Sequence, residues 1–238
     1  MKCLSALTAT SMAVLLLSCG SEPAKEETKS ADTTVAAASA PAEVKPPFIP
    51  FKVVMIQHKV KNFDKSEVEY FNRDSLRNTY GITHYVIGRD LKDSNTVFVL
   101  DKITDVDKAK AFYALPAARE AMKKAGVSGP PGFTYAEFVR VNDNPVQFTE
   151  GLAVSHRVKD YGIWLKAYNA DSASRSSNGL IERGIARNLY DSNTVSVLFE
   201  VSDSAKAKAR MKSPDLQKIM TDAGVEGPPT IRWYRLIK

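Results

Sequence analysis

The chain has 238 residues, of which 44% are hydrophobic and 25% are charged, and these proportions are typical of one large globular domain or two small ones. They exclude a chain that is disordered throughout. The formal net charge is +6, but the basic residues are scattered and form no block or stripe, which argues against nucleic acid as a partner.

Residues 1–18 have the pattern of an export signal. Lys2 precedes an apolar segment from about Leu4 to Leu17, which is too short to span a bilayer comfortably. The segment ends in Leu-Leu-Ser-Cys, which resembles the lipobox of bacterial lipoproteins. The resemblance implies cleavage after residue 18 and acylation of Cys19, which would anchor the chain to membrane lipid at the bacterial cell envelope, on a periplasmic or outer-membrane face. The alternative is an ordinary cleaved signal peptide with an incidental cysteine.

Residues 19–50 are rich in alanine, serine, threonine, glutamate, lysine and proline. Such a segment buries too little apolar surface to offset the entropy of ordering it, so we expect a disordered tether. Cys3 and Cys19 are the only cysteines of the chain. The folded part therefore contains neither a disulfide nor a cysteine-based metal site.

An internal repeat organises the remainder. The pentapeptide Asp-Ser-Asn-Thr-Val occurs at residue 93 and again at residue 191, and residues 53–140 align with 151–238 without a gap. About a third of the aligned positions match, which indicates duplication of one unit. We expect a first unit at 51–141, a linker at 142–150 and a second unit at 151–238.

Each unit predicts the same order of elements. An alternating strand is followed by a helix that a glycine closes, two strands joined at Asp-Ser-Asn, a helix broken by proline and stopped by Gly-Pro-Pro, and a last strand. In the first unit these are 53–60, 64–81, 82–90, 95–103, 105–126 and 132–141. In the second they are 151–158, 160–179, 180–188, 193–201, 203–224 and 230–238.

Apolar side chains of the first helix of each unit should pack on the sheet. They are Val68, Phe71 and Leu76 in the first unit, and Ile163, Trp164, Ala167 and Tyr168 in the second. The β-α-β-β-α-β order is ferredoxin-like, with both helices on one face of an antiparallel sheet and the other face bare.

The second unit carries a resemblance to a known family. The stretches HRVKDYGIWLKAY, ARNLYDSNTVSVLFEV and SPDLQKIMTDAGVEGPP resemble the antibiotic-biosynthesis-monooxygenase-like and cyclase-like proteins of the dimeric α+β barrel superfamily. In that superfamily two bare sheet faces close into a barrel. The resemblance implies an α+β fold of two tandem ferredoxin-like units forming a barrel within one chain, and a monomer with an internal pseudo-dimer. The first unit departs from the pattern, because Asn62-Phe63 replaces Asp160-Tyr161 and Val68 or a neighbour must stand in for Trp164.

The resemblance also suggests where chemistry would lie. Cofactor-independent oxygenases and cyclases of this superfamily use histidine, tyrosine, tryptophan, asparagine or arginine in a cavity between sheet and helices to bind and deprotonate a substrate. The candidate catalytic residues here are His58, His156, Arg89 and Arg187. Candidate ligand-binding residues are His84, Tyr85, Tyr135, Arg183, Trp233 and Tyr234.

Each candidate also has a structural interpretation. A histidine on an apolar strand face is often a core residue satisfied by a backbone group, and an arginine at a strand end often pairs with the adjacent hairpin. The sequence has no HExxH, no CxxC and no glycine-rich phosphate loop, so we expect neither a metal nor a cofactor. Two functions stay open: a non-catalytic protein that binds a small molecule in the barrel or a helix–sheet cleft, and a cofactor-independent monooxygenase or cyclase.

Overall fold

The computed structural model describes residues 47–237. The predicted signal segment, Cys19 and most of the predicted tether lie outside that range. Within it, eight strands and eight helices follow one order twice. None of the helices in residues 47–237 is long and apolar enough to cross a membrane.

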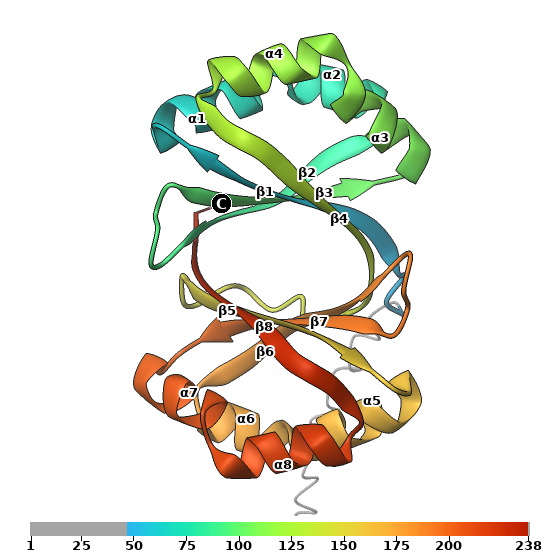
Figure 1. Cartoon of the computed structure of the whole chain (residues 1–238), viewed down its shortest axis with the longest axis vertical. Coiled ribbons are helices and arrows are strands. Elements are labelled where there is room, and N and C mark those ends of the chain that lie inside the picture. Colours follow the sequence, from blue (N-terminus) through green and yellow to red (C-terminus); the bar gives the residue numbers. More distant parts are fainter. Residues whose placement is uncertain (1–46, 238) are drawn as a thin grey trace, which may run out of the picture. The chain divides into compact units, whose positions relative to one another are not determined.

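The first unit has the order β1-α1-α2-β2-β3-α3-α4-β4 (Figure 1). Its elements are β1 (Phe51–Val60), α1 (Phe63–Phe71), α2 (Asp74–Thr79), β2 (Ile82–Asp90), β3 (Thr96–Ile103), α3 (Val106–Ala114), α4 (Pro116–Lys124) and β4 (Val127–Val141). The second unit repeats this order. Its elements are β5 (Glu150–Val158), α5 (Tyr161–Ala170), α6 (Ser172–Ser177), β6 (Leu180–Asn188), β7 (Thr194–Val201), α7 (Ser204–Met211), α8 (Pro214–Asp222) and β8 (Val225–Leu236).

The eight strands close into one antiparallel barrel in the order β1-β3-β2-β8-β5-β7-β6-β4. Each unit contributes a four-stranded ferredoxin-like sheet, and the pairs β2–β8 and β4–β6 join the two sheets. The helices cover the outer face of each sheet, so the two inner faces enclose the barrel interior (Figure 1). The predicted fold, two ferredoxin-like units forming a barrel within one chain, is confirmed.

Alternate residues of each strand face the helices or the barrel interior. In β3, Val97 and Val99 face the helices and are buried, whereas Phe98 and Leu100 face inward and are only half-buried. The same alternation continues in β7. Side chains that face the inside of a closed barrel and still have accessible surface must border empty space.

The first helix of each unit differs from the prediction in two ways. A short break separates α1 from α2 and α5 from α6, where one continuous helix was expected. Three residues of the predicted apolar stripe are exposed: Val68 by 59%, Leu76 by 37% and Ile163 by 63%.

The helix caps explain which residues face the sheet. The side chain of Asn62 accepts a hydrogen bond from the backbone of Lys65 and so begins α1, just as Asp160 begins α5. This places Ser66 and Trp164 at the same position of their helices, and both are buried. The residue that stands in for Trp164 is therefore Ser66, so of the expected alternatives, Val68 or a neighbour, it is a neighbour and not the exposed Val68.

The Gly-Pro-Pro segments lie inside the last strands and do not stop the helices. α4 and α8 end before Gly126 and Gly224, and the strands begin directly afterwards. In the β1–β4 register, Gln57 is opposite Gly132 but Lys59 is opposite Ser128. Three residues, 129–131, therefore bulge opposite His58, and a bulge tolerates proline because its backbone N–H is not needed for pairing.

The repeated Asp-Ser-Asn-Thr-Val stretch forms the turn that enters β3 and β7, as predicted. The Asp93 carboxylate accepts hydrogen bonds from the backbone N–H of Asn95 at 3.1 Å and from the Thr96 hydroxyl at 3.0 Å. Asp191 accepts the matching bonds at 3.2 and 2.9 Å. Identical residues thus fix identical turns.

Candidate functional site

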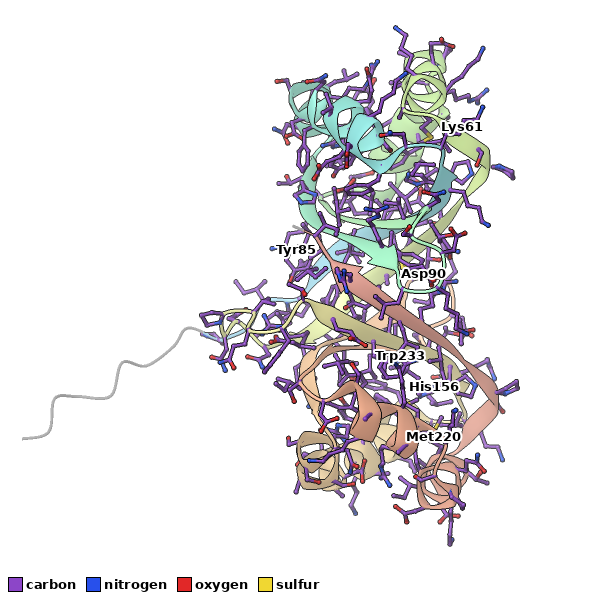
Figure 2. The ribbon with its side chains drawn as sticks, turned by 90° about the vertical axis from the view of Figure 1, so that its left-hand side faces the viewer. Lys61, Tyr85, Asp90, His156, Met220 and Trp233 are labelled. Atoms are coloured by element: carbon purple, nitrogen blue, oxygen red, sulfur yellow. The ribbon has the colours of Figure 1, made fainter. Side chains whose placement is uncertain are left out.

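Two small cavities lie between the sheet and the helices, one in each unit. Their volumes are about 80 Å³ in the first unit and about 70 Å³ in the second. His58 borders the first cavity and His156 borders the second, so the two histidines occupy equivalent places. Figure 2 shows His156 on the sheet side of the second cavity and Met220 of α8 on its helix side.

Neither histidine has the backbone partner expected of a core histidine. Nδ1 of His58 and both ring nitrogens of His156 are buried without a hydrogen-bond partner among the residues described. The His156 ring instead faces the Trp164 ring, with centroids 5.7 Å apart. Burial lowers the pKa of each imidazole from 6.5 to about 4, so both are neutral at pH 7.

A buried carboxylate organises the polar wall of the first cavity. Asp101 on β3 is fully buried and accepts hydrogen bonds from the hydroxyls of Tyr70 at 2.5 Å and Tyr113 at 3.0 Å. The Arg77 guanidinium lies 3.5 Å from the centroid of the Tyr70 ring. Burial, reinforced by the Asp101 charge, raises the pKa of both tyrosines, so their hydroxyls stay protonated and act as donors.

The second cavity has the same tyrosine and arginine but takes its carboxylate from another strand. The Arg175 guanidinium lies 3.6 Å from the centroid of the Tyr168 ring. The Tyr168 hydroxyl donates to Glu182 on β6 at 2.8 Å, and Arg140 donates two bonds to the same carboxylate, at 2.7 and 2.8 Å. The repeat aligns Glu182 with His84, and Asp101 with Phe199.

Sequence reasoning did not select these two carboxylates, although a signal for Asp101 was present. Asp101 falls on the same strand face as the apolar Val97 and Val99, where a charged residue is unexpected. The matching pairs Tyr70/Tyr168 and Arg77/Arg175 also stand out in the alignment of the two units.

Arg89 and Arg187 border neither helix–sheet cavity. Each lies at the end of its strand and donates from Nε to a carbonyl of the adjacent hairpin, that of Ser94 or Ser192, at 2.7 Å in both cases. Their guanidinium groups lie over the rings of Phe63 and Tyr161, respectively. These contacts fit the structural interpretation, in which the arginine pairs with its hairpin.

Three candidates of the first unit lie in different places. His84 joins the Asp101 cluster, with Nδ1 3.0 Å from the Tyr70 hydroxyl. Tyr135 is buried on the helix side of β4. Tyr85 (Figure 2) packs its ring against Phe51, with centroids 5.5 Å apart, and does not border either helix–sheet cavity.

Two candidates of the second unit also lie outside its cavity. Arg183 has Nη1 3.6 Å from a carboxylate oxygen of the buried Glu200. Trp233 (Figure 2) packs against the core of the second unit, and Nζ of Lys208 lies 5.3 Å from its ring centroid. The folded chain therefore does not assemble the predicted candidates into one site.

The interior of the barrel forms a third internal cavity, of about 320 Å³, roughly four times the volume of either helix–sheet cavity. All eight strands contribute to its wall. Much of the wall is apolar, from Val53, Met55, Val86, Phe98, Leu100, Phe138 and Leu198. The polar lining residues are Thr134, Ser155, Asn188, Thr194, Ser196, Thr230, Arg232 and Tyr234.

Two lining residues of β8 distinguish this cavity. Tyr234 packs over Gly151, where a Cβ atom would lie 2.4 Å from the tyrosine ring, and burial raises the pKa of Tyr234 to about 12. Arg232 brings a positive charge to the wall. Sequence reasoning missed Arg232, although its position, two residues from Thr230 and Tyr234 in an alternating strand, places it on the inner face.

Other sites are less developed in the part of the chain that the structure describes. A groove of about 400 Å³ beside α4 and β4 has several exposed residues in its lining, among them Arg119, Lys123 and Phe133, and none that is fully buried. Within residues 47–237, no group of three or more histidine, cysteine, aspartate or glutamate side chains is placed to hold a metal ion.

No protein-family model matches this sequence, and no curated protein matches it either. Solved structures do resemble it. An anthrone oxidase-like protein has a TM-score of 0.54 at 11% identity, over 79% of this chain and 92% of its own. A candidate monooxygenase from Fusobacterium nucleatum subsp. nucleatum has a TM-score of 0.51 at 9% identity, over 80% and 93%. A ferredoxin-fold protein from Listeria monocytogenes related to antibiotic biosynthesis monooxygenases has 0.44 at 12%, over 80% and 97%.

The first two similarities extend over about four-fifths of this chain, so they cover both units. At 9% and 11% identity they establish the fold alone. The chemistry must therefore be argued from its own cavities.

Proposed function

We propose that this chain is a small-molecule-binding lipoprotein of the cell envelope, whose ligand lies inside the barrel. The observation that carries the proposal is the interior cavity of about 320 Å³. Small-molecule sites are typically concave, largely apolar and roughly 300–1,000 Å³ in volume, with a few polar groups that orient the ligand. The barrel interior meets each of these criteria.

The half-buried state of the inward-facing residues supports this proposal. A protein interior is normally close-packed, and an empty apolar space lowers stability because its lining loses dispersion contacts. Leu100 and Leu198, which are aligned in the two units, both border the space. Filling it with an apolar ligand would restore those contacts.

The two units suggest a variant that fills the cavity with little strain. The repeat aligns Phe98 with Ser196, and Met55 with Ala153, and all four residues line the cavity. The double variant Ser196→Phe/Ala153→Met therefore gives the second unit the larger side chains that the first unit already carries. We expect it to fold, to melt no lower than the wild type, and to lose binding of N-phenyl-1-naphthylamine, an uncharged dye whose fluorescence rises in apolar sites.

A matched control is Ile163→Ala, which removes apolar surface from an exposed helix position. Dye binding should be unchanged in this variant. If the cavity-filling variant binds the dye as well as the wild type does, the dye site lies elsewhere and the proposal fails.

The membrane anchor is tested separately at Cys19. Metabolic labelling with a palmitate analogue should modify the wild type, and Cys19→Ala should abolish the label because the thiol that accepts the diacylglycerol is gone. Cys3→Ala is the control and should be labelled normally. A Cys19→Ala protein that still takes up the label would rule out the anchor.

A second candidate function is a cofactor-independent monooxygenase or cyclase acting on a small aromatic or enolisable compound. One observation favours it: His156 is a neutral imidazole without a partner and borders a cavity. That cavity has about 70 Å³, roughly half the volume of an engineered apolar cavity of about 150 Å³ that binds benzene. If His156 is a general base, oxygen uptake with anthrone should fall about a hundredfold in His156→Leu. Equal rates in both proteins would exclude this role.

A further inference from the structure

We propose that the ligand of the barrel is a monoanion with an apolar body, such as a carboxylate with an aliphatic or aromatic tail, and that the guanidinium of Arg232 binds its anionic group. This inference rests on the proposed function, because it names the chemical class of the molecule that occupies the interior cavity. Four observations lead to it.

Arg232 places a cation on the wall of the barrel cavity. Its neighbours in the alternation of β8, Thr230 and Tyr234, line the same cavity. Its guanidinium carbon lies 5.4 Å from the ring centroid of Phe98, which projects into the cavity from β3 in the opposite sheet. The charge is therefore held at the wall between the two sheets.

The described residues provide no direct ion-pair partner for Arg232. Nη1 of Arg232 is buried and has no hydrogen-bond partner within residues 47–237, and no carboxylate there lies within 4.0 Å of the guanidinium. The carboxylate with an electrostatic effect on Arg232 is that of Asp90, and one of its oxygens already accepts the backbone N–H groups of Lys92 and Asp93. The Arg232 side chain as a whole is half-buried, but a buried donor without an acceptor is unfavourable, so Nη1 is available to bind an anionic group inside the cavity.

The remaining wall carries no formal charge. Its other polar groups are hydroxyls and one amide, and none of the lining side chains in the described part of the chain is acidic. A single cation among neutral donors and apolar groups is matched by a single negative charge. A dianion or a phosphate ester with several charges would be only partly neutralised.

The charge occurs in one half of the pseudo-symmetric barrel. The repeat aligns Arg232 with Thr134, which also lines the cavity. The ligand is therefore held in one orientation, with its anionic group at β8 and its tail toward the apolar residues. A cavity of about 320 Å³ limits that tail to a medium-length chain or a small ring system.

The test uses the purified full chain and two probes of equal length, decanoate and decan-1-ol, measured by isothermal titration calorimetry. A hydrogen bond to a charged group contributes enough to change affinity by about tenfold or more. We therefore expect the wild type to bind decanoate at least tenfold more tightly than decan-1-ol. Arg232→Met, which keeps the apolar stem of the side chain, should lose this preference and bind the alcohol with unchanged affinity.

A relocated charge provides the control for folding. Adding Thr134→Arg to Arg232→Thr moves the guanidinium to the equivalent position of the other unit, and the preference for decanoate should return. If the wild type binds both probes equally, or if Arg232→Met keeps its preference for decanoate, this inference is wrong while the proposed function stands. If neither probe nor the uncharged dye binds, the proposed function itself is wrong.

Discussion

His58 and His156 are imidazoles held in apolar surroundings, each beside a cavity that admits only a few water molecules. Their neutral form is favoured because burial penalises the charged form, and burial lowers the pKa of both imidazoles. Their effect on folding should therefore appear as pH falls. The lowered pKa of the buried histidine is common to both units.

The first prediction concerns the pH dependence of stability. The pKa of His156 is about 4 in the folded chain and about 6.5 in the unfolded chain, so the unfolded chain takes up its proton first as pH falls. The stability associated with the neutral imidazole is present above pH 6.5 and is lost between pH 6.5 and 4, by on the order of 3 kcal/mol. His156→Leu cannot be protonated, so its unfolding free energy should fall less over this interval.

Urea unfolding of the wild type and of His156→Leu at pH 7 and pH 4.5 measures this difference. The carboxylates that titrate in the same range are common to both proteins, so the comparison isolates the histidine. His58→Leu should show the same behaviour in the first unit. Parallel losses of stability in the wild type and the variants would show that the imidazoles are protonated in the folded chain as readily as in water.

At the scale of the elements, the two units provide the hydrogen-bond acceptor for equivalent tyrosine hydroxyls from different strands. Asp101 on β3 accepts the Tyr70 hydroxyl, and Glu182 on β6 accepts the Tyr168 hydroxyl. The positions are exchanged, because Asp101 aligns with Phe199 and Glu182 aligns with His84. In each unit the two strands concerned are neighbours, β2 and β3 in the first and β6 and β7 in the second. A carboxylate on either strand can therefore reach the tyrosine hydroxyl of that unit.

The second prediction gives the first unit the carboxylate position that the second unit uses. Asp101→Phe removes a buried acceptor and leaves the hydroxyls of Tyr70 and Tyr113 without it, which should cost about 3 kcal/mol of unfolding free energy. Adding His84→Glu supplies a carboxylate at the place of Glu182, and we expect it to recover at least about 1 kcal/mol.

A double-mutant cycle by urea denaturation measures this recovery. His84→Glu alone is the reference, because in the presence of Asp101 it places two carboxylates side by side and should destabilise the protein. If the effects of Asp101→Phe and His84→Glu are simply additive, the two strands are not interchangeable and the explanation fails.

At the scale of the whole molecule, neither unit buries its inner sheet face alone. The two sheets meet through β2–β8 and β4–β6, and these pairings also cover the outer strands of each sheet. The linker contributes to the closure, because Glu200 accepts the backbone N–H groups of Gln147 and Phe148 at 2.7 and 2.6 Å. One chain thus provides both halves of a barrel.

The third prediction follows from this closure. We expect the full chain to be a monomer, because its two sheets bury each other's inner faces and pair each other's outer strands. A single unit, residues 150–238, would expose the inner face of its sheet and the unpaired edges of its two outer strands, and should dimerise or aggregate. Sedimentation measurements distinguish these states, and a single unit that stays monomeric and folded would contradict the prediction.

The sequence by itself determined the strands, the hairpins and the two-unit architecture. These features rest on local signals: the alternation in β1 and β5, the turn chemistry of Asp93 and Asp191, and a repeat long enough to exceed chance. The sequence determined less well which side of each helix faces the sheet, because the caps at Asn62 and Asp160, and not hydropathy alone, decide this. Val68 was misplaced for that reason.

Only the tertiary structure decided where the cavities lie and which side chains border them. A cavity forms where side chains from several strands fail to fill a volume, and no single segment encodes that volume. In the sequence Arg232 is one more basic residue of a strand, and its place on the cavity wall, with Nη1 buried and unpartnered, is evident only when Phe98 from the opposite sheet lies beside it. Local patterns therefore fixed the elements, whereas contacts between residues far apart in the chain created the site.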